Sequence, residues 1–192
     1  IWDDCSIDGT TEICQDYAMK HPDKIELVAQ EKNTFLEPYL KMQSYSAIKK
    51  ISTKYFCIID GDDYWCDCNK VQIALDFLEN NDSYIGFAHD TLQVEQFTQK
   101  RLSYVHEVLK WDVKTHVEFS VDAPFFLTSS RIFRNVNYYK EKVLPIDYLL
   151  YYYHLSKGAI YYYDKIMASY VIGENSTFAT LQNIKDLCGM FA

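Results

Sequence analysis

The chain has 192 residues, of which 48% are hydrophobic, and its formal net charge is -8. This length predicts one domain with a substantial core, and the hydrophobic content excludes a disordered chain. The acidic charge and the lack of a basic stripe argue against a nucleic-acid partner. No apolar run reaches the length of about 20 residues that spans a bilayer, and no secretory leader is visible. We therefore expect a cytoplasmic protein, with peripheral contact to the inner face of the membrane as an option.

The first part of the chain alternates between strands and helices. Residues 1–2 read as the end of a strand, and an acidic turn leads into a helix that Thr10 or Thr11 caps and that runs to about Lys20. A short strand over residues 25–28 and a helix over residues 39–51 follow. Residues 55–59 are an apolar run of the kind that is buried on both faces of a parallel sheet.

The same alternation continues to the end of the chain. We expect a helix from Asn69 to about Asn80, a strand over residues 85–89 and an irregular excursion over residues 90–118. The remaining expected elements are a strand over 119–127, a helix over 146–156, a strand over 160–163 and a closing helix from Asn175. This order predicts an α/β fold with a mostly parallel central sheet flanked by helices.

Two acidic turns follow two separate strands of this predicted sheet. Asp3 and Asp4 form the first turn, and Asp60, Asp62 and Asp63 form the second. Parallel strands end at the same edge of a sheet, so these carboxylates can converge on one crevice. Carboxylates at such short distances repel one another unless a cation lies among them. Oxygen ligands of this kind suit Mg²⁺ or Mn²⁺. The alternative is an acidic loop in solvent.

The two turns resemble the motifs of family 2 glycosyltransferases. Residues 3–10 read Asp-Asp-Cys-Ser-Ile-Asp-Gly-Thr, which is similar to the family signature Asp-Asp-x-Ser-x-Asp-Gly-Thr. Residues 60–65 resemble the family's Asp-x-Asp metal motif, and the likeness extends to about Tyr170. The resemblance implies a GT-A fold and a metal-dependent, inverting transfer of sugar from a nucleotide diphosphate donor, with a UDP-sugar favoured. It also implies a glycan or glycolipid acceptor in bacterial surface glycan synthesis.

The resemblance also assigns roles to the acidic residues. Asp4, together with Asp3, would bind the nucleotide base, and Asp60 would lie near the ribose. Asp62 would hold Mn²⁺ or Mg²⁺, and Asp63 would be a further ligand or support the turn from behind. A divalent cation there stabilises the charge that builds on the leaving diphosphate.

The base that activates the acceptor hydroxyl is expected at Asp147. In the family an Asp occupies the start of a helix in the equivalent place, and Asp147 opens the predicted helix of this chain. Its carboxylate would take the hydroxyl proton as the anomeric carbon is attacked. The alternative is that Asp147 only provides a negative charge at the N-terminus of the helix, where the helix dipole favours it.

The chain departs from the family at two places. It keeps the Tyr of the family's Tyr-Arg-x-His motif at Tyr170, but Val171 and Gly173 stand where the Arg and the His are expected. The family's first strand and helix should precede Ile1. We expect a single domain over residues 1–192, with a nucleotide-binding half to about residue 90 and an acceptor half after it.

Other functions remain open on these residues. A nucleotidyltransferase that makes nucleotide sugars shares the sheet and the metal, and a non-catalytic glycosyltransferase-like binding module fits the missing Arg and His. A haloacid-dehalogenase phosphatase needs an Asp nucleophile where this chain has Ser6. An EF-hand starting at Asp60 would place Trp65 and Val71 where Gly and Glu are required.

Overall fold

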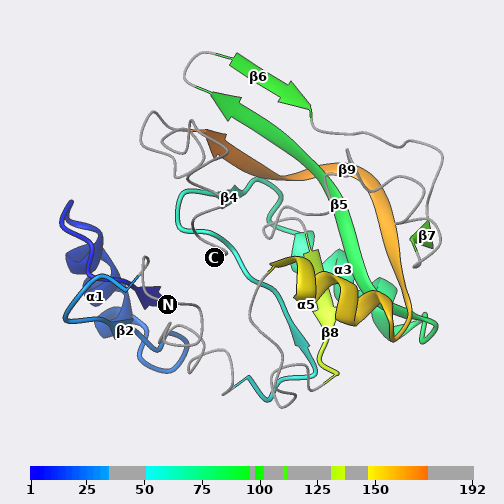
Figure 1. Cartoon of the computed structure of the whole chain (residues 1–192), viewed down its shortest axis with the longest axis horizontal. Helices are drawn as coiled ribbons and strands as arrows, with labels where there is room; N and C mark the ends of the chain where they lie inside the picture. The colour runs from blue at the N-terminus through cyan, green and yellow to red at the C-terminus, as the bar shows by residue number, and fades with distance from the viewer. Residues whose placement is uncertain (35–50, 96–97, 102–109, 112–130, 137–146, 173–192) are drawn as a thin grey trace, which may run out of the picture. The chain divides into compact units, whose positions relative to one another are not determined.

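The computed structural model describes residues 1–34, 51–95, 98–101, 110–111, 131–136 and 147–172 (Figure 1). The chain divides into two compact units, each described here by itself. The first contains Ile1–Thr53 and Asn137–Leu149, and the second contains Lys54–Val136 and Leu150–Ala192. The helices expected over 39–51 and from 175 onward, and the strand expected over 119–127, lie outside the described residues.

The described residues 1–34 of the first unit form a small parallel sheet and helix α1. Strand β1 (Trp2–Asp3) pairs in parallel with β2 (Val28–Ala29), and α1 (Thr10–Lys20) connects them. The helix ends at Lys20, as predicted, but neither Thr10 nor Thr11 is its N-cap. Gly9, with a φ of 91°, is the N-cap, and the Asp8 carboxylate accepts a hydrogen bond from the Thr10 N–H at 3.1 Å.

The apolar residues of α1 do not form a buried face. Ile13 and Tyr17 have the helical spacing of a buried stripe, yet they are 61% and 53% exposed. No residue of α1 is buried. The position of α1 therefore depends on its two ends and not on an apolar face.

The second unit is built on a larger sheet, in which five strands lie in the order β3-β8-β5-β9-β4. Two further strands flank it, because β6 pairs with β5 and β7 pairs with β9. Figure 1 shows β5 and β9 running together over most of their length. The strands are β3 (Tyr55–Phe56), β4 (Tyr64–Trp65), β5 (Tyr84–Glu95), β6 (Thr98–Arg101), β7 (Lys110–Trp111), β8 (Arg131–Arg134) and β9 (Ala159–Ile172).

This sheet is mixed and not mostly parallel, which corrects the sequence prediction. Only β5 and β9 pair in parallel, and every other described pair in the sheet is antiparallel. The crossover from β3 through α3 (Lys70–Glu79) to β5 does make β3 and β5 point the same way, as a strand–helix–strand unit should. The antiparallel strand β8 lies between them, and β4 adds an antiparallel edge on β9.

Two strands are much longer than predicted. Strand β5 has 12 residues and β9 has 14. The predicted strand ended at His89, before the polar residues Asp90 and Thr91, yet all three residues are fully buried within β5. In β9 the exposed pair Asp164 and Lys165 interrupted the apolar pattern in the same way.

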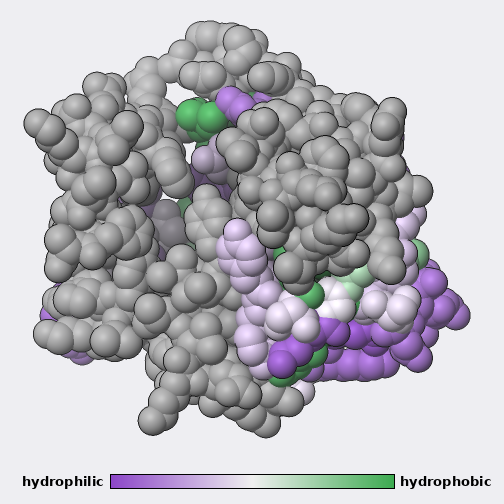
Figure 2. Space-filling model, turned by 45° about the vertical axis from the view of Figure 1, so that its right-hand side comes forward, coloured by the Kyte–Doolittle hydropathy of each residue, from purple (hydrophilic) through white to green (hydrophobic). Residues whose placement is uncertain are grey.

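Helix α3 covers the sheet and supplies part of the core. Ala74 and Leu78 of this helix pack with Phe87, Ile132 and Met167. On the face shown in Figure 2, the described residues at the lower right are mainly hydrophilic, with small hydrophobic areas among them. In the described part of the chain, no helix has both the length and the apolar character that crossing a bilayer requires.

A tight contact between β5 and β8 gives a first prediction. A Cβ atom added at Gly86 would lie 2.7 Å from Cδ1 of Phe133 and 3.2 Å from the carbonyl oxygen of Ile132. We expect Gly86→Ala to lower the free energy of unfolding by about 1–3 kcal/mol, because a well-packed core resists an added methyl group. Urea denaturation measures this change. Gly61→Ala is the matched control, because a Cβ there meets nothing within 4 Å, and equal stability of the two variants would contradict the prediction.

Candidate functional site

The second acidic turn, residues 60–63, presents carboxylates to solvent at the start of β4. The N–H of Asp63 donates to the carbonyl oxygen of Asp60 at 3.1 Å, which closes the turn. Asp60, Gly61 and Asp62 are exposed, whereas Asp63 is buried. Gly61 does not have a positive φ, so the conformation of this turn does not require a glycine.

Asp63 anchors this turn to the end of β9. Its Oδ1 accepts a hydrogen bond from the backbone N–H of Val171 at 3.1 Å. The next residues continue the attachment, because β4 pairs with Ser169 and Ala168 of β9. The turn is therefore held by one buried carboxylate while the two exposed carboxylates face outward.

Tyr170 lies next to the same turn. Burial raises the pKa of Tyr170, and the negative charges of the turn, that of Asp63 foremost, raise it further. The phenol therefore stays protonated near neutral pH and can donate a hydrogen bond beside the carboxylates. The sequence comparison noted this tyrosine only as part of a family motif, and the structure adds it to the candidate site.

The exposed carboxylates suit an open metal site and not a closed cage. Among the described residues, no group of three or more His, Cys, Asp or Glu side chains is arranged to hold a metal ion. Mg²⁺ commonly uses one or two carboxylates together with phosphate oxygens and water. Asp62, with Asp60 two residues away on the same turn, fits that ligand set.

The first acidic turn lies in the other unit, in a loop that we call the signature loop (residues 3–10). Asp3 is 4% exposed, and its carboxylate accepts hydrogen bonds from the hydroxyls of Ser6 and Thr11, each at 2.5 Å. The bonds from Ser6 and then Thr11 hold the pKa of Asp3 below its usual value. Asp3 therefore ties the start of the loop to the first turn of α1.

Asp4 connects the signature loop to the segment after β2. Its Oδ2 accepts a hydrogen bond from the Thr34 N–H at 2.9 Å, and its Oδ1 accepts one from the Thr34 hydroxyl at 2.8 Å. Each carboxylate oxygen has a second acceptor position for a ligand. Thr34 was not among the predicted site residues, since nothing in its local sequence indicates a partner 30 positions away.

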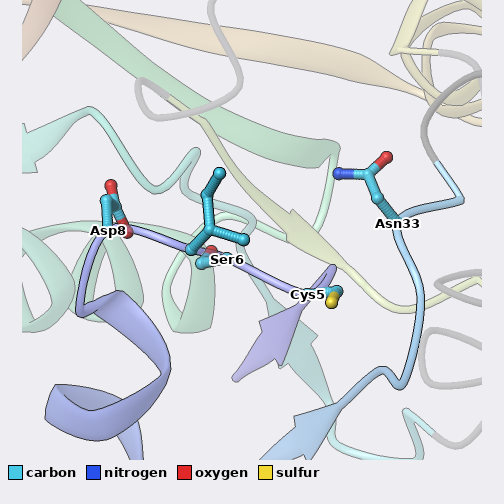
Figure 3. Close-up of a pocket in the computed structure, with 5 residues that line it drawn as sticks. Cys5, Ser6, Asp8 and Asn33 are labelled. Atoms are coloured by element: carbon cyan, nitrogen blue, oxygen red, sulfur yellow. The ribbon is translucent and has the colours of Figure 1, made fainter.

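A pocket of about 300 Å³ opens beside the signature loop. It is lined by Cys5, Ser6, Ile7, Asp8 and Asn33. Figure 3 shows the Asn33 amide extending from the segment after β2 toward the loop that carries the other labelled residues. The pocket thus combines an amide, a hydroxyl and a carboxylate with the apolar Ile7.

The loop beside this pocket contains one strained residue. Cys5 has a φ of 64°, in the left-handed region that costs an L-residue roughly 1–2 kcal/mol. We expect Cys5→Gly to raise the free energy of unfolding by about 0.5–1 kcal/mol, because relief of this strain exceeds the greater freedom of Gly in the unfolded chain.

Thermal or urea denaturation measures the change at Cys5. Gly9→Ala is the matched control, because Gly9 has a φ of 91° and open space around it. That variant should be less stable than the parent protein by about 1 kcal/mol. A loss of stability in Cys5→Gly would contradict the assigned conformation.

A buried lysine follows the acidic turn in the second unit. Lys70 is fully buried, and its Nζ lies 4.2 Å from the centre of the Trp65 ring. Burial lowers the pKa of Lys70 to about 7. The nearby His89 is also fully buried. Burial, and to a smaller extent the positive charge of Lys70, lowers the pKa of His89 to about 3. His89 is therefore neutral at physiological pH, as expected of a structural histidine.

The sequence carries one signal of the burial of Lys70. Lys70 precedes Ala74 and Leu78 at helical spacing, and these three are the buried residues of α3. A lysine at the head of a buried stripe is unusual, because its charge costs free energy when it leaves water.

Asp147 is the first residue of α5 (Asp147–Leu155), the position that the sequence predicted for it. Further along this helix, the ring of His154 stacks on that of Phe133, with centroids 4.3 Å apart.

The structure groups Asp60, Asp62 and Asp63 in one unit and Asp3 and Asp4 in the other. Their convergence on one crevice, and the role of each, stay predictions.

Three bacterial proteins are similar to this chain. They come from two strains of Mycobacterium tuberculosis and from Mycobacterium bovis, and each is named only as an uncharacterized protein. Each is 24% identical over 173 residues, which cover 88% of this chain and 48% of the relative. The chain therefore spans about half the length of the curated relatives it matches.

The family comparison covers most of the chain and includes both acidic turns. The model of the family described as Glycosyl transferase family 2 matches residues 1–137. The match contains the signature loop with its pocket, the acidic turn and the strand–helix–strand unit that carries Lys70. The α/β architecture is consistent with the GT-A fold of that family. This chain belongs to glycosyltransferase family 2.

Proposed function

We propose that the chain transfers a sugar from a nucleotide diphosphate donor to an acceptor hydroxyl, with inversion at the anomeric carbon and with Mn²⁺ or Mg²⁺. The observation that carries this proposal is the acidic turn, with two exposed carboxylates on a base anchored to β9. A turn built for structure alone would have little reason to hold exposed like charges this close together. Membership of the family supports the same reaction.

The diphosphate end of the donor would lie at the acidic turn. Asp62 would hold the metal, Asp60 would lie near the ribose, and Asp63 would either add a ligand or keep its present bond to Val171. A bound divalent cation would neutralise the charge that builds on the leaving diphosphate. The neutral phenol of Tyr170 would donate a hydrogen bond to a phosphate oxygen beside the turn.

The base end of the donor would occupy the pocket beside the signature loop. The free acceptor positions of Asp4 suit an N–H group of a nucleotide base, and uracil presents one, which favours a UDP-sugar. Asp4 directly precedes Cys5, which lines the pocket, and the lining residues Asn33 and Ser6 offer further hydrogen bonds. Asp3 would act on the base through the loop that it holds in place.

The acceptor would be activated at the start of α5. Its hydroxyl proton would pass to the carboxylate of Asp147 as the hydroxyl oxygen forms a bond to the anomeric carbon. The bond from that carbon to the diphosphate oxygen breaks at the same time, and attack from the opposite face inverts the configuration. We place this acceptor half after about residue 90 and propose a glycan or glycolipid acceptor of bacterial surface glycan synthesis, used in the cytoplasm at the inner face of the membrane.

One observation favours a second candidate, a non-catalytic binding module. Val171 and Ile172 follow Tyr170 at the end of β9. The arginine with which the family motif can bind a donor is therefore absent at this position. Such a module would bind the nucleotide without releasing the sugar.

A thermal-shift screen tests the donor. The purified chain is heated with each of a panel of nucleotide sugars, with and without Mn²⁺. A ligand that binds the native state stabilises it by mass action and so raises the melting temperature. At a ligand concentration of 100 times the Kd, the free energy of unfolding rises by about 2.7 kcal/mol. We expect the largest rise with one nucleotide diphosphate sugar and Mn²⁺ together.

The same panel separates the rival functions. A nucleoside triphosphate that stabilises the chain more than any nucleotide sugar would indicate a nucleotidyltransferase. Stabilisation by a nucleotide sugar without any release of nucleotide diphosphate over hours would indicate the binding module. No metal-dependent shift with any donor would contradict the proposed function.

A further inference from the structure

Exposed apolar side chains gather around the acidic turn. In the described part of the second unit, four large apolar side chains are exposed, and these are Ile59, Tyr64, Val71 and Tyr152. Ile59 directly precedes the turn of residues 60–63, and Tyr64 directly follows it. Single exposed apolar residues are common on protein surfaces. Two of them on either side of one pair of exposed carboxylates indicate a ligand that has both an apolar and a polar side.

The backbone of the turn brings these two residues together. The hydrogen bond from the Asp63 N–H to the Asp60 carbonyl oxygen closes the turn, so the chain enters and leaves it at neighbouring positions. The side chains of Ile59 and Tyr64 therefore start from either side of the exposed carboxylates of Asp60 and Asp62.

The strand register places Tyr64 and Tyr170 on opposite faces of the β4–β9 pair. Tyr64 lies opposite Ser169, and opposed residues of an antiparallel pair have their side chains on the same face. Tyr170 follows Ser169 and so points to the other face. Ser169 is buried, whereas Tyr64 is 48% exposed. The proposed function uses Tyr170 at a phosphate oxygen, and Tyr64 presents its ring to a different part of the donor.

A sugar ring matches this combination of surfaces. A hexopyranose carries hydroxyl groups on its rim and C–H groups on its faces. Such a face leaves water when it packs on an aromatic ring, and carboxylate oxygens accept hydrogen bonds from the hydroxyls. In a nucleotide diphosphate sugar the ring is bonded directly to the diphosphate, which the proposed function places at Asp62. Tyr64 is two residues from Asp62, a Cα–Cα distance of at most about 7 Å.

The charge of the same turn disfavours an acidic sugar. The exposed carboxylates of Asp60 and Asp62, together with the diphosphate, carry more negative charge than one divalent cation neutralises. A uronic acid would add a further carboxylate beside them, and like charges at short range repel one another. The formal net charge of the chain, -8, acts in the same direction.

We propose that Tyr64, with Ile59 beside it, is a specificity-determining residue of the donor site, because its exposed ring receives the C–H face of a neutral hexose joined to the metal-bound diphosphate. This inference rests on the proposed function and deepens it by naming the class of sugar, a neutral hexopyranose and not a uronic acid.

Calorimetry with the purified chain and Mn²⁺ tests this role. The Kd of UDP is compared with those of UDP-glucose, UDP-galactose and UDP-N-acetylglucosamine. If GDP or dTDP binds in place of UDP, that nucleotide and its neutral hexose conjugates are used. In Tyr64→Ala we expect the Kd of the best-bound neutral conjugate to rise about two- to tenfold, while the Kd of the nucleotide diphosphate alone stays the same. Tyr64→Phe should keep the wild-type values, because it retains the face of the ring.

Three further comparisons complete the test. Tyr152→Ala is the matched control, because Tyr152 lies on α5 and is 45% exposed, and it should change neither Kd. Ile59→Ala should weaken binding of the conjugate by a smaller factor than Tyr64→Ala. In the wild type, UDP-glucuronic acid should bind about threefold or more weakly than UDP-glucose, and added salt should narrow this difference because it screens the repulsion.

Each outcome decides the inference. A folded Tyr64→Ala with the wild-type Kd for every neutral conjugate overturns it, while metal-dependent nucleotide binding leaves the proposed function standing. An equal loss for the nucleotide alone also overturns it, because Tyr64 would then support the turn and not the sugar. Tighter binding of UDP-glucuronic acid than of any neutral conjugate excludes the sugar class. If Tyr64→Ala does not fold, Ile59→Ala decides, and an unchanged Kd for the conjugate rejects the inference. If no nucleotide diphosphate binds with Mn²⁺, the proposed function fails and this inference fails with it.

Discussion

Replacement of Asp147 by asparagine should lower the rate of sugar transfer by a factor on the order of 10² to 10⁴, the usual contribution of a general base. Asparagine has nearly the same shape as aspartate but cannot accept the proton of the acceptor hydroxyl. Asp147 is the first residue of α5, and asparagine, like aspartate, is well accepted at the start of a helix. The chemical step should suffer while the fold and the donor site remain.

Two measurements together test this expectation. Single-turnover transfer gives the rate of the chemical step, and calorimetry gives the Kd of the donor nucleotide, which should change less than about threefold, or 0.7 kcal/mol. Asp76→Asn is the control, because Asp76 lies on α3 and accepts a hydrogen bond from Gln72 on an exposed surface. Transfer at the wild-type rate by Asp147→Asn would exclude this residue as the base.

The second large effect is expected at the acidic turn. Asp62→Asn should weaken metal-dependent binding of the nucleotide diphosphate about 10- to 100-fold, because the neutral amide is a poor ligand for a hard cation. The melting temperature of the free protein should not fall, because the Asp62 side chain is exposed.

Asp63→Asn gives the contrasting result within the same turn. Its carboxylate is buried and accepts a hydrogen bond from the Val171 N–H, so the variant should lose about 1–2 kcal/mol of stability. Nucleotide binding with and without Mn²⁺, together with thermal denaturation, separates the two effects. If Asp62→Asn lowers stability and leaves metal-dependent binding intact, the two residues have been assigned the wrong way round.

The sequence alone predicted those features that depend on neighbouring residues. Helix α3 begins and ends where the apolar spacing and the flanking asparagines indicated, and α5 begins at Asp147. The acidic turn has the exposed carboxylates that its composition suggested. Local chemistry is enough for such features, since their partners lie within a few positions.

The features that the sequence could not predict depend on distant partners. Strand β8 lies between β3 and β5 in the sheet, although it begins more than 40 residues after the start of β5 in the sequence. A short run such as residues 131–134 does not specify which strand it pairs with. The length of β5 was missed because burial of the polar residues Asp90 and Thr91 depends on what covers both faces of the sheet. The bond from Asp4 to Thr34 and the contact of Lys70 with Trp65 likewise require the folded chain.

The proposed function requires that one metal-bound nucleotide diphosphate contacts both Asp62 and Asp4. Paramagnetic broadening by Mn²⁺ in the presence of UDP tests it directly on the ¹⁵N-glycine-labelled chain. Gly61 reports on the acidic turn and Gly9 on the signature loop. Gly158 is the internal control, because β9 extends roughly 35 Å from Ala159 to Tyr170.

We predict that Mn²⁺ with UDP broadens the amide signals of both Gly61 and Gly9, leaves Gly158 sharp, and loses its effect on both in Asp62→Asn. Broadening of Gly61 alone, with Gly9 as sharp as in the metal-free protein, would contradict the proposal that one donor contacts both turns.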